Sequence, residues 1–147
     1  MKKKEDSFHI EIIRQNLINR SHDKKQKCLF VVLKLPEPLA PIKCAVLPLV
    51  NKDGLPEKAQ EIVNDLKFHF NTSIEAKDSI GKRYRRQDAI GTPFCVTVDG
   101  DTLTDNTVTL RYRDSMKQER VPIAKLREII EDRVSITSLL KKLDVKE

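Results

Sequence analysis

The sequence predicts an α/β fold in which one mixed sheet is flanked by helices. Three observations carry this prediction. Two apolar runs, Cys44–Val50 and Pro93–Val98, are typical of strands that are buried on both faces. Residues 55–70 and 123–131 place apolar side chains along one side of a helix. Residues 107–113 alternate between apolar and polar side chains, as a strand does.

The chain first becomes strand-like at Leu29–Leu33, where β-branched and aromatic residues gather. Prolines at positions 36, 38 and 41 then predict an extended connection to the apolar run that begins at Cys44. Pro48, inside that run, indicates a strand end or an edge position, because proline has no N–H to donate to a neighbouring strand. The next helix is expected to begin at Asp53–Glu57, where Pro56 suits the first helical turn.

The remaining elements are shorter. In order, they are a strand at 71–76, a helix that Asp78 or Ser79 caps and Gly91 ends, a strand at 93–98, a turn at 99–106, strands at 107–113 and 119–122, a helix at 123–131 and a short helix from Ser135. A helix connects the strands of the first half, so those strands are expected to be parallel. Short turns join the later strands, which are expected to be antiparallel.

One folded domain is expected from a chain of 147 residues. Residues 1–27 form a polar, lysine-rich N-terminal lead or linker, residues 28–133 the domain, and residues 134–147 a short C-terminal helix and tail. Within the lead, residues 8–18 fit a short strand or a helix, and both alternatives stay open. Residues 20–27 have the composition of a linker.

Net charge and cysteine content indicate the kind of partner and the cellular compartment to expect. The chain carries 28 lysines and arginines against 22 acidic residues, a formal net charge of +6. A basic balance favours an anionic partner such as a nucleic acid. The spacing of the three cysteines suits neither a disulfide framework nor a zinc cluster, and Cys44 and Cys95 are expected in the core. These features suit a reducing compartment, and no apolar run reaches about 20 residues, so we expect a cytoplasmic protein without a membrane partner.

Sequence motifs of the common enzyme classes are absent. The chain has no phosphate-binding P-loop, no dinucleotide-binding glycine motif, no zinc-protease motif and no serine-hydrolase motif. We therefore predict no catalytic residue and no metal site, and we expect that this chain alone is not an enzyme. Asp99, Asp101 and Asp105 cluster around the predicted turn, where aspartate favours local hydrogen bonds. The alternative, a Mg²⁺ site or an acid–base pair at these carboxylates, stays open.

The helix predicted between Ser79 and Gly91 is the most informative segment. Helical periodicity places Lys82, Arg85 and Arg86 on one face, so we expect this face to present cations outward. Its first turn also offers free backbone N–H groups to an anion. The opposite side is apolar and is expected to pack inward through Ile80, Tyr84 and Ile90.

A second basic element ends the strand at 107–113. Arg111 and Arg113 are two positions apart, so they point to the same face of the sheet. Arginine suits bidentate contacts with phosphates and base edges, and the carboxylate of Asp114 could accept a hydrogen bond from a base amino group. Ion pairing with surface carboxylates is the alternative for these arginines. Two basic clusters on one compact fold favour RNA or single-stranded nucleic acid as the partner.

Three segments resemble the C-terminal anticodon-binding domain of glycyl-tRNA synthetases of the dimeric, class II type: Leu39–Leu49, Asp78–Asp99 and Thr109–Met116. The resemblance extends over about residues 29–133. It implies a mixed five-stranded sheet flanked by three helices, which agrees with the pattern-based prediction. Two positions depart from the family. Lys82 stands where an arginine is common, and Gly100 stands where an aromatic residue is usual.

The resemblance implies a tRNA-binding module that recognises the anticodon stem-loop of glycine tRNA. By position, Lys82, Arg83, Arg113 and Asp114 correspond to residues that approach the anticodon bases. Arg85, Arg86 and Arg111 are candidates for phosphate contacts or structural ion pairs. Ligation of glycine to tRNA needs ATP and Mg²⁺ on a catalytic domain that is absent from this chain, so the chain itself is expected to hold no cofactor. The isolated domain is expected to be a monomer, and the parent enzyme a homodimer.

Two alternatives stay beside this interpretation. The chain is either a domain excised from a synthetase or a free-standing nucleic-acid-binding module. On the same fold, an accessory subunit of a DNA polymerase, of the processivity type, is the second hypothesis.

Overall fold

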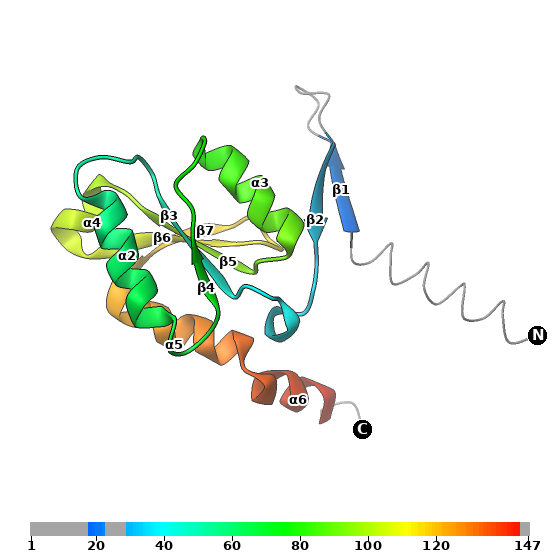
Figure 1. The fold of residues 1–147 in the computed structure, drawn as a ribbon. Helices are drawn as coiled ribbons and strands as arrows, with labels where there is room; N and C mark the ends of the chain where they lie inside the picture. The colour runs from blue at the N-terminus through cyan, green and yellow to red at the C-terminus, as the bar shows by residue number, and fades with distance from the viewer. Residues whose placement is uncertain (1–17, 23–28, 145–147) are drawn as a thin grey trace, which may run out of the picture.

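In a computed structural model, which describes residues 18–22 and 29–144, the chain forms a five-stranded sheet and a separate two-stranded ribbon (Figure 1). The sheet has the order β4-β3-β5-β6-β7. Its strands are β3 (Cys44–Pro48), β4 (Thr72–Ile74), β5 (Phe94–Val98), β6 (Thr107–Tyr112) and β7 (Gln118–Pro122). Strand β3 runs parallel to β4 and β5, whereas β6 and β7 are antiparallel to their neighbours. The predicted mixed sheet is confirmed.

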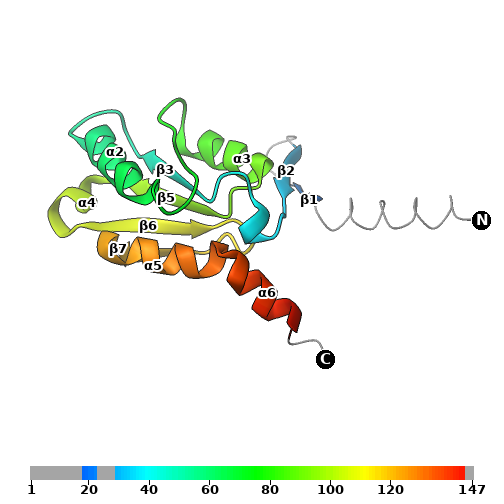
Figure 2. The same cartoon turned by 60° about the horizontal axis from the view of Figure 1, so that its bottom comes forward.

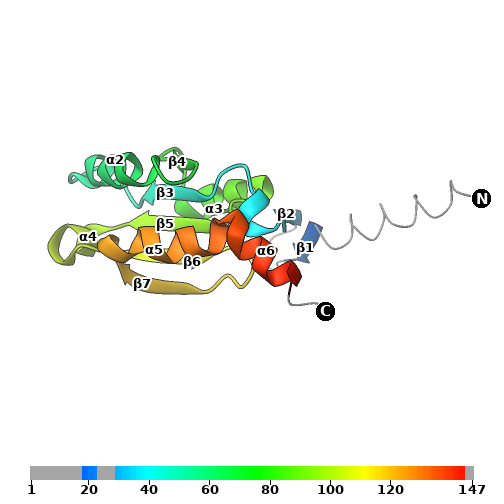
Figure 3. The same ribbon diagram turned by 90° about the horizontal axis from the view of Figure 1, so that it is seen from below.

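Helices cover both faces of the sheet. The α2 helix (Leu55–Leu66) and the α5 helix (Ile123–Val134) share one core with alternate residues of β3, β5 and β6. The α3 helix (Ile80–Ile90) packs on the opposite face against Ala45, Leu47 and Cys95. Seen from below, α5 lies in front of the strands and α3 behind them (Figure 3). The strict alternation of side chains along a strand therefore decides which residues meet α3.

Several local predictions are confirmed. Cys44 and Cys95 are fully buried, and Pro48 ends β3. Although β3 lies inside the sheet, its pairing with β4 ends at Val46, so Pro48 has a strand partner only on the β5 side. Gly91 ends α3 in a left-handed conformation with φ of 88°. The predicted short helix from Ser135 is observed as α6 (Ile136–Asp144), which extends away from the sheet in Figure 2, whereas the short helix α4 (Gly100–Asp105) was not predicted. No helix in the part of the chain that the structure describes is long and apolar enough to cross a membrane.

The predicted turn at 99–106 was wrong, because these residues form α4. Asp99 caps this helix by accepting a hydrogen bond from the Thr102 backbone N–H at 3.2 Å, and the Thr102 hydroxyl is 3.1 Å from the Asp99 backbone nitrogen, which donates to it. Such a reciprocal capping box normally shows glutamate or glutamine at the third helical position. Because threonine occupies that position here, the usual sequence pattern does not identify the start of α4.

The N-terminal ribbon consists of β1 (Ile18–His22) paired antiparallel with β2 (Leu29–Leu33), and β2 lies against α3. The predicted linker over residues 20–27 is therefore strand in its first three residues. Backbone pairing with β2 accounts for this, since strand ladders form through main-chain groups whatever the side-chain polarity. Residues 23–28 and the strand-or-helix alternative at residues 8–17 lie outside the described residues.

Candidate nucleic-acid interface

A polar layer lies between α3 and the sheet. Alternation along β6 points Arg111 toward α3, where its guanidinium donates to both oxygens of Asp88 at 2.8 and 3.0 Å. Both residues are buried, and the guanidinium carbon lies 4.7 Å from the ring centroid of Tyr84. Of the two roles proposed for Arg111, the geometry fits the structural ion pair. A buried arginine held by a carboxylate at two points is not available to a phosphate.

Arg83 anchors the first turn of α3. Its side chain is buried, and its guanidinium donates to the carbonyls of Pro48, Glu75 and Leu49 at 2.6, 3.1 and 3.2 Å. Burial lowers the pKa of Arg83 from its usual range. These bonds tie the helix to the ends of β3 and β4. The expectation that Arg83 approaches a base does not fit this arrangement, because its guanidinium faces the sheet edge.

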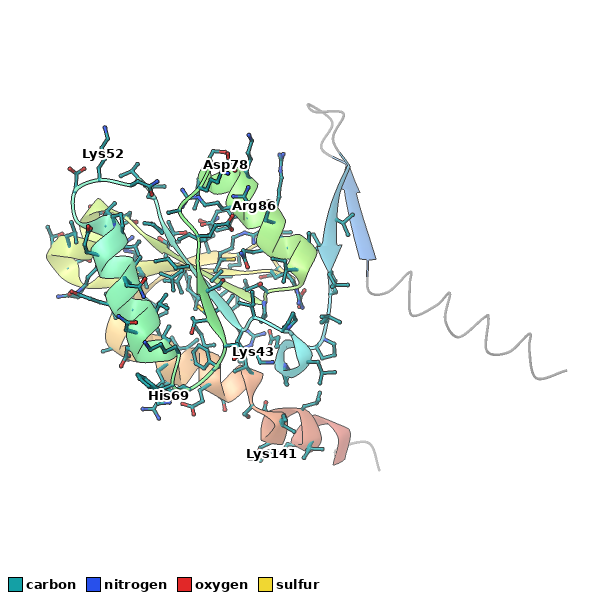
Figure 4. The ribbon with its side chains drawn as sticks, viewed as in Figure 1. Lys43, Lys52, His69, Asp78, Arg86 and Lys141 are labelled. Carbon is teal, nitrogen blue, oxygen red and sulfur yellow. The ribbon has the colours of Figure 1, made fainter. Side chains whose placement is uncertain are left out.

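The outward face of α3 carries the predicted cations. Lys82 is exposed, and Arg85 and Arg86 are partly exposed. Arg86 pairs with Glu75 and, at 2.8 Å, with Asp78, and it donates to the Lys77 carbonyl. Figure 4 shows Arg86 beside Asp78 at the start of the helix. The hydrogen bond from Arg86 lowers the pKa of the Asp78 carboxyl.

The inward face of α3 is less apolar than predicted. Ile80 and Tyr84 pack on the sheet as expected, but Ile90 is exposed. In its place Gln87 and Asp88 are buried, together with Arg83. Tyr84 also shares a hydrogen bond of 2.5 Å with Thr97. The helix is therefore docked largely by hydrogen bonds and ion pairs.

Arg113 and Asp114 form a second anchored pair, at the end of β6. Arg113 is only 2% exposed and donates to the carbonyls of Gly91 and Leu35, both at 2.7 Å. It also holds both carboxylate oxygens of Asp114, at 2.7 and 2.9 Å. The Asp114 side chain is 49% exposed. Of the two predicted base contacts, the structure presents Asp114 at the surface and buries Arg113 behind it.

A hollow of about 410 Å³ opens beside Asp114. Its charged lining pairs internally: Arg113 with Asp114, Arg133 with Glu37, and Lys117 with Glu119. The Tyr112 hydroxyl donates to Glu119, and burial raises the pKa of Tyr112 to about 12. The lining consists of Glu37, Pro93, Tyr112, Arg113, Asp114, Ser115, Lys117, Glu119 and Arg133. Three cations thus face three carboxylates, and the hollow has no net charge.

The two predicted pairs of base contacts lie at opposite ends of the sheet. Arg83 contacts the end of β3, whereas the backbone of Arg113 donates to Pro93 just before β5. Because β3 and β5 are parallel, the end of β3 and the start of β5 lie at opposite ends of the strands. The α3 helix spans the distance between them, about 16 Å for its 11 residues. Lys82 and Arg83 therefore cannot share one base-sized site with Arg113 and Asp114.

The acidic cluster has local partners. Asp99 caps α4 and pairs with Arg120 at 3.0 Å, and that hydrogen bond lowers the pKa of Asp99. Asp105 accepts from the backbone and hydroxyl of Thr107 at 2.9 and 2.7 Å. These contacts match the predicted role in local hydrogen bonding. Among the residues that the structure describes, no group of three potential ligands is arranged to hold a metal ion.

Sequence inspection missed Arg133 and Glu37, which form an ion pair in the lining of the hollow. They lie 96 positions apart, on α5 and on a short 3-10 turn η1 (Glu37–Leu39). No local spacing could reveal such a pair.

Comparisons with known proteins agree with the sequence resemblance. A family model described as "Anticodon binding domain" matches residues 43–133. The chain is 55% identical over 107 residues to a glycine–tRNA ligase of Rhodopirellula baltica, covering 73% of this chain and 20% of that protein. It is 60% identical over 95 residues to that of Treponema denticola, covering 65% and 21%. The chain thus spans about a fifth of these relatives.

A solved structure supports the fold. The RNA binding domain of threonyl-tRNA synthetase from Cryptosporidium parvum Iowa II superposes with a TM-score of 0.62 at 24% identity. The match covers 68% of this chain and 25% of that one. At this identity the likeness concerns the arrangement of the sheet and helices.

Proposed function

The chain belongs to the anticodon-binding domain family, and from this premise we propose that it binds the anticodon stem-loop of glycine tRNA as part of a glycyl-tRNA synthetase. Glycine–tRNA ligases supply the similar sequences, and the chain is basic overall. Two separate surfaces would bind the RNA. Phosphate contacts on one would position the RNA, and base contacts on the other would recognise its sequence.

The outward face of α3 is the proposed phosphate-binding surface. Lys82, Arg85 and Arg86 lie there on one helix. The resemblance implied a base contact for Lys82, but its exposed side chain is a compact charge on a flexible stem, so we assign it to the phosphates instead. Such contacts release counterions and contribute affinity that falls with salt. They carry no sequence information, so replacing Lys82 should weaken binding equally for every anticodon.

The hollow beside Asp114 is the proposed base-reading site, and the Arg113–Asp114 pair is the observation that carries this assignment. An ionised carboxylate only accepts hydrogen bonds, so Asp114 would favour a base that presents an amino group, such as cytosine, over uracil. Arg113 would act as a positioning residue, because its guanidinium fixes the carboxylate from the buried side. Arg83 and Arg111 would have the same supporting role for α3.

The rest of the synthetase reaction would take place elsewhere. ATP and Mg²⁺ would bind a catalytic domain outside this chain, and dimerisation of the parent enzyme would use surfaces outside it too. The cytoplasm, where tRNA is charged, is the proposed compartment. None of the residues discussed above needs a cofactor for its proposed role.

Binding of short RNAs tests the proposal. A labelled anticodon stem-loop of glycine tRNA is titrated with the full chain, beside stem-loops in which each anticodon base is replaced. We expect the glycine stem-loop to bind best, with single replacements at the read base costing roughly 1–3 kcal/mol. Equal affinity for all anticodons would contradict base reading. A stronger preference for primer–template DNA would instead favour the polymerase-subunit hypothesis.

A further inference from the structure

We propose that Arg133 provides the surface on which one unpaired RNA base stacks within the hollow, next to Asp114. This inference rests on the proposed function and adds a binding residue that neither the sequence pattern nor the family resemblance supplied. It assigns to Arg133 a contact with the face of the base, whereas Asp114 would read its edge.

Two aromatic rings support one side of Arg133. Its guanidinium carbon lies 5.2 Å from the ring centroid of Tyr112 and 5.4 Å from that of Phe94. These two rings meet edge to face, with centroids 5.7 Å apart. Phe94 is fully buried in the main core. The guanidinium therefore lies on a rigid aromatic base, in the distance range of cation–π contacts.

Glu37 fixes the orientation of the Arg133 guanidinium. Its two carboxylate oxygens accept from Nε at 3.0 Å and from Nη2 at 2.5 Å. A bidentate arginine–carboxylate pair is planar, so the two groups together form a flat plate. Lys43 donates to the carbonyls of Pro38 and Ala40 and so holds the turn that carries Glu37; Figure 4 shows it beside that turn. The Glu37 side chain is 14% exposed, against 45% for Arg133.

Arg133 is among the residues that line the hollow, and its guanidinium lies over the rings of Tyr112 and Phe94. We therefore assign the side of the guanidinium away from these rings to the base. Guanidinium planes are common stacking partners for unpaired RNA bases. Tyr112 lines the hollow as well, and the Arg133 guanidinium lies over its ring, so a base could contact both. This would supply stacking in a domain with few exposed aromatic residues.

The charge balance of the hollow favours a base over a phosphate. Three carboxylates and three cations line it, all of them paired, so an incoming phosphate gains little net attraction. A neutral flat ring needs instead a planar surface and hydrogen-bonding groups at its edge. Arg133 offers the surface, and Asp114 and Ser115 offer groups at the rim. The volume, about 410 Å³, is within the range of small-ligand sites.

A thermodynamic cycle between Arg133 and an abasic nucleotide tests this assignment. Binding is measured for wild-type chain and Arg133→Ala, each with the glycine anticodon stem-loop and with versions in which one anticodon base at a time is removed. We expect one position at which removing the base weakens wild-type binding at least about 5-fold, the lower end of a stacking contact. Arg133→Ala should also weaken binding, and removing that same base should then cost several-fold less than it does in the wild-type chain, because only the edge contact with Asp114 remains to be lost.

Two further variants keep the test decisive. Arg127→Ala removes a similarly exposed cation from the same helix, outside the hollow, and should change binding by less than about 2-fold. Arg133→Lys keeps the charge without the plane, so it should bind as weakly as Arg133→Ala while retaining the preference for cytosine over uracil at the read base. Loss of that preference would point to collapse of the hollow and would overturn a stacking role.

Each outcome bears on one hypothesis. Additive effects of Arg133→Ala and base removal at all three anticodon positions would overturn the stacking proposal while leaving anticodon recognition intact. Failure of the wild-type chain to distinguish any anticodon would contradict the proposed function itself. If Arg133→Ala lowers the melting temperature too far for binding measurements, the same cycle is run with Arg133→Lys, and additivity there overturns the proposal.

Discussion

The guanidinium of Arg113 holds the carboxylate of Asp114 at two points while also binding the carbonyls of Gly91 and Leu35. One buried side chain thus joins the end of α3, the segment before η1 and the rim of the hollow. The geometry separates two roles that the sequence assigned jointly: Asp114 faces solvent, and Arg113 positions it.

Replacement of Arg113 should therefore affect both stability and recognition. Arg113→Met removes the buried cation and leaves the carbonyls of Gly91 and Leu35 without their partner, which costs about 1–3 kcal/mol for each group left unsatisfied. Urea unfolding measures the loss. Discrimination between anticodons should also relax, because Asp114 loses its fixed orientation. Unchanged discrimination in a folded variant would show that Asp114 does not need Arg113.

The buried pair between Arg111 and Asp88 should stabilise the docking of α3. Removing one partner, as in Asp88→Asn, leaves a buried charge uncompensated and should lower the free energy of unfolding by about 3–5 kcal/mol. The double change Arg111→Met with Asp88→Leu should be less harmful than Asp88→Asn alone, since no charge remains buried. Arg127→Ala, which breaks the exposed ion pair with Glu131, is the control. It should change the free energy of unfolding by less than about 0.5 kcal/mol. A similar loss in Asp88→Asn and in the control would contradict a buried ion pair.

Gly91 should be intolerant of a side chain. Its φ is 88°, and an added β-carbon would lie 3.1 Å from the Leu33 carbonyl oxygen. Gly91→Ala is expected to destabilise the fold by about 1–3 kcal/mol. Gly81→Ala, within the same helix and with no atom in contact range, should instead stabilise it by about 0.5–1 kcal/mol. Thermal unfolding of both variants checks the contrast, and equal shifts in both would refute it.

Acid should weaken the fold partly through Asp99. The hydrogen bond from Arg120 holds the pKa of Asp99 below its unfolded value. A depressed carboxyl pKa contributes stability above the unfolded pKa of about 3.9, and this contribution is lost as pH falls through the folded pKa. Asp99→Asn keeps the capping oxygen without the charge, so its deficit in unfolding free energy should be full at pH 6 and shrink below about pH 4. A deficit that stays constant with pH would exclude the charge as its source.

The sheet could be predicted from the sequence because its signals are local. The apolar runs of β3 and β5, the capping glycine of α3 and the proline that ends β3 each act on their own backbone. Alternation along β6 also placed Arg111 and Arg113 correctly on one face. The predicted elements match the structure in type and order, with two exceptions: α4 was predicted as a turn, and residues 20–22 were predicted as linker but belong to β1.

The candidate site was harder to predict because its contacts are distant in sequence. Periodicity grouped the cations of α3 but gave no sign that Arg83 would meet three carbonyls at the sheet edge. The partners of Arg111 and Arg133 lie 23 and 96 positions away. Whether an arginine faces solvent or a buried carboxylate depends on tertiary packing, which residue type alone leaves undetermined.

The most direct test of the central claim is the anticodon preference of Asp114→Asn, measured as the ratio of affinities for the glycine stem-loop and its cytosine-to-uracil variants. Asparagine has nearly the same shape but adds a donor, so it can pair with the uracil oxygen that a carboxylate repels. We predict that the preference for cytosine falls by roughly 1–3 kcal/mol at one anticodon position, with little change at the others. An unchanged ratio at every position would contradict base reading by Asp114.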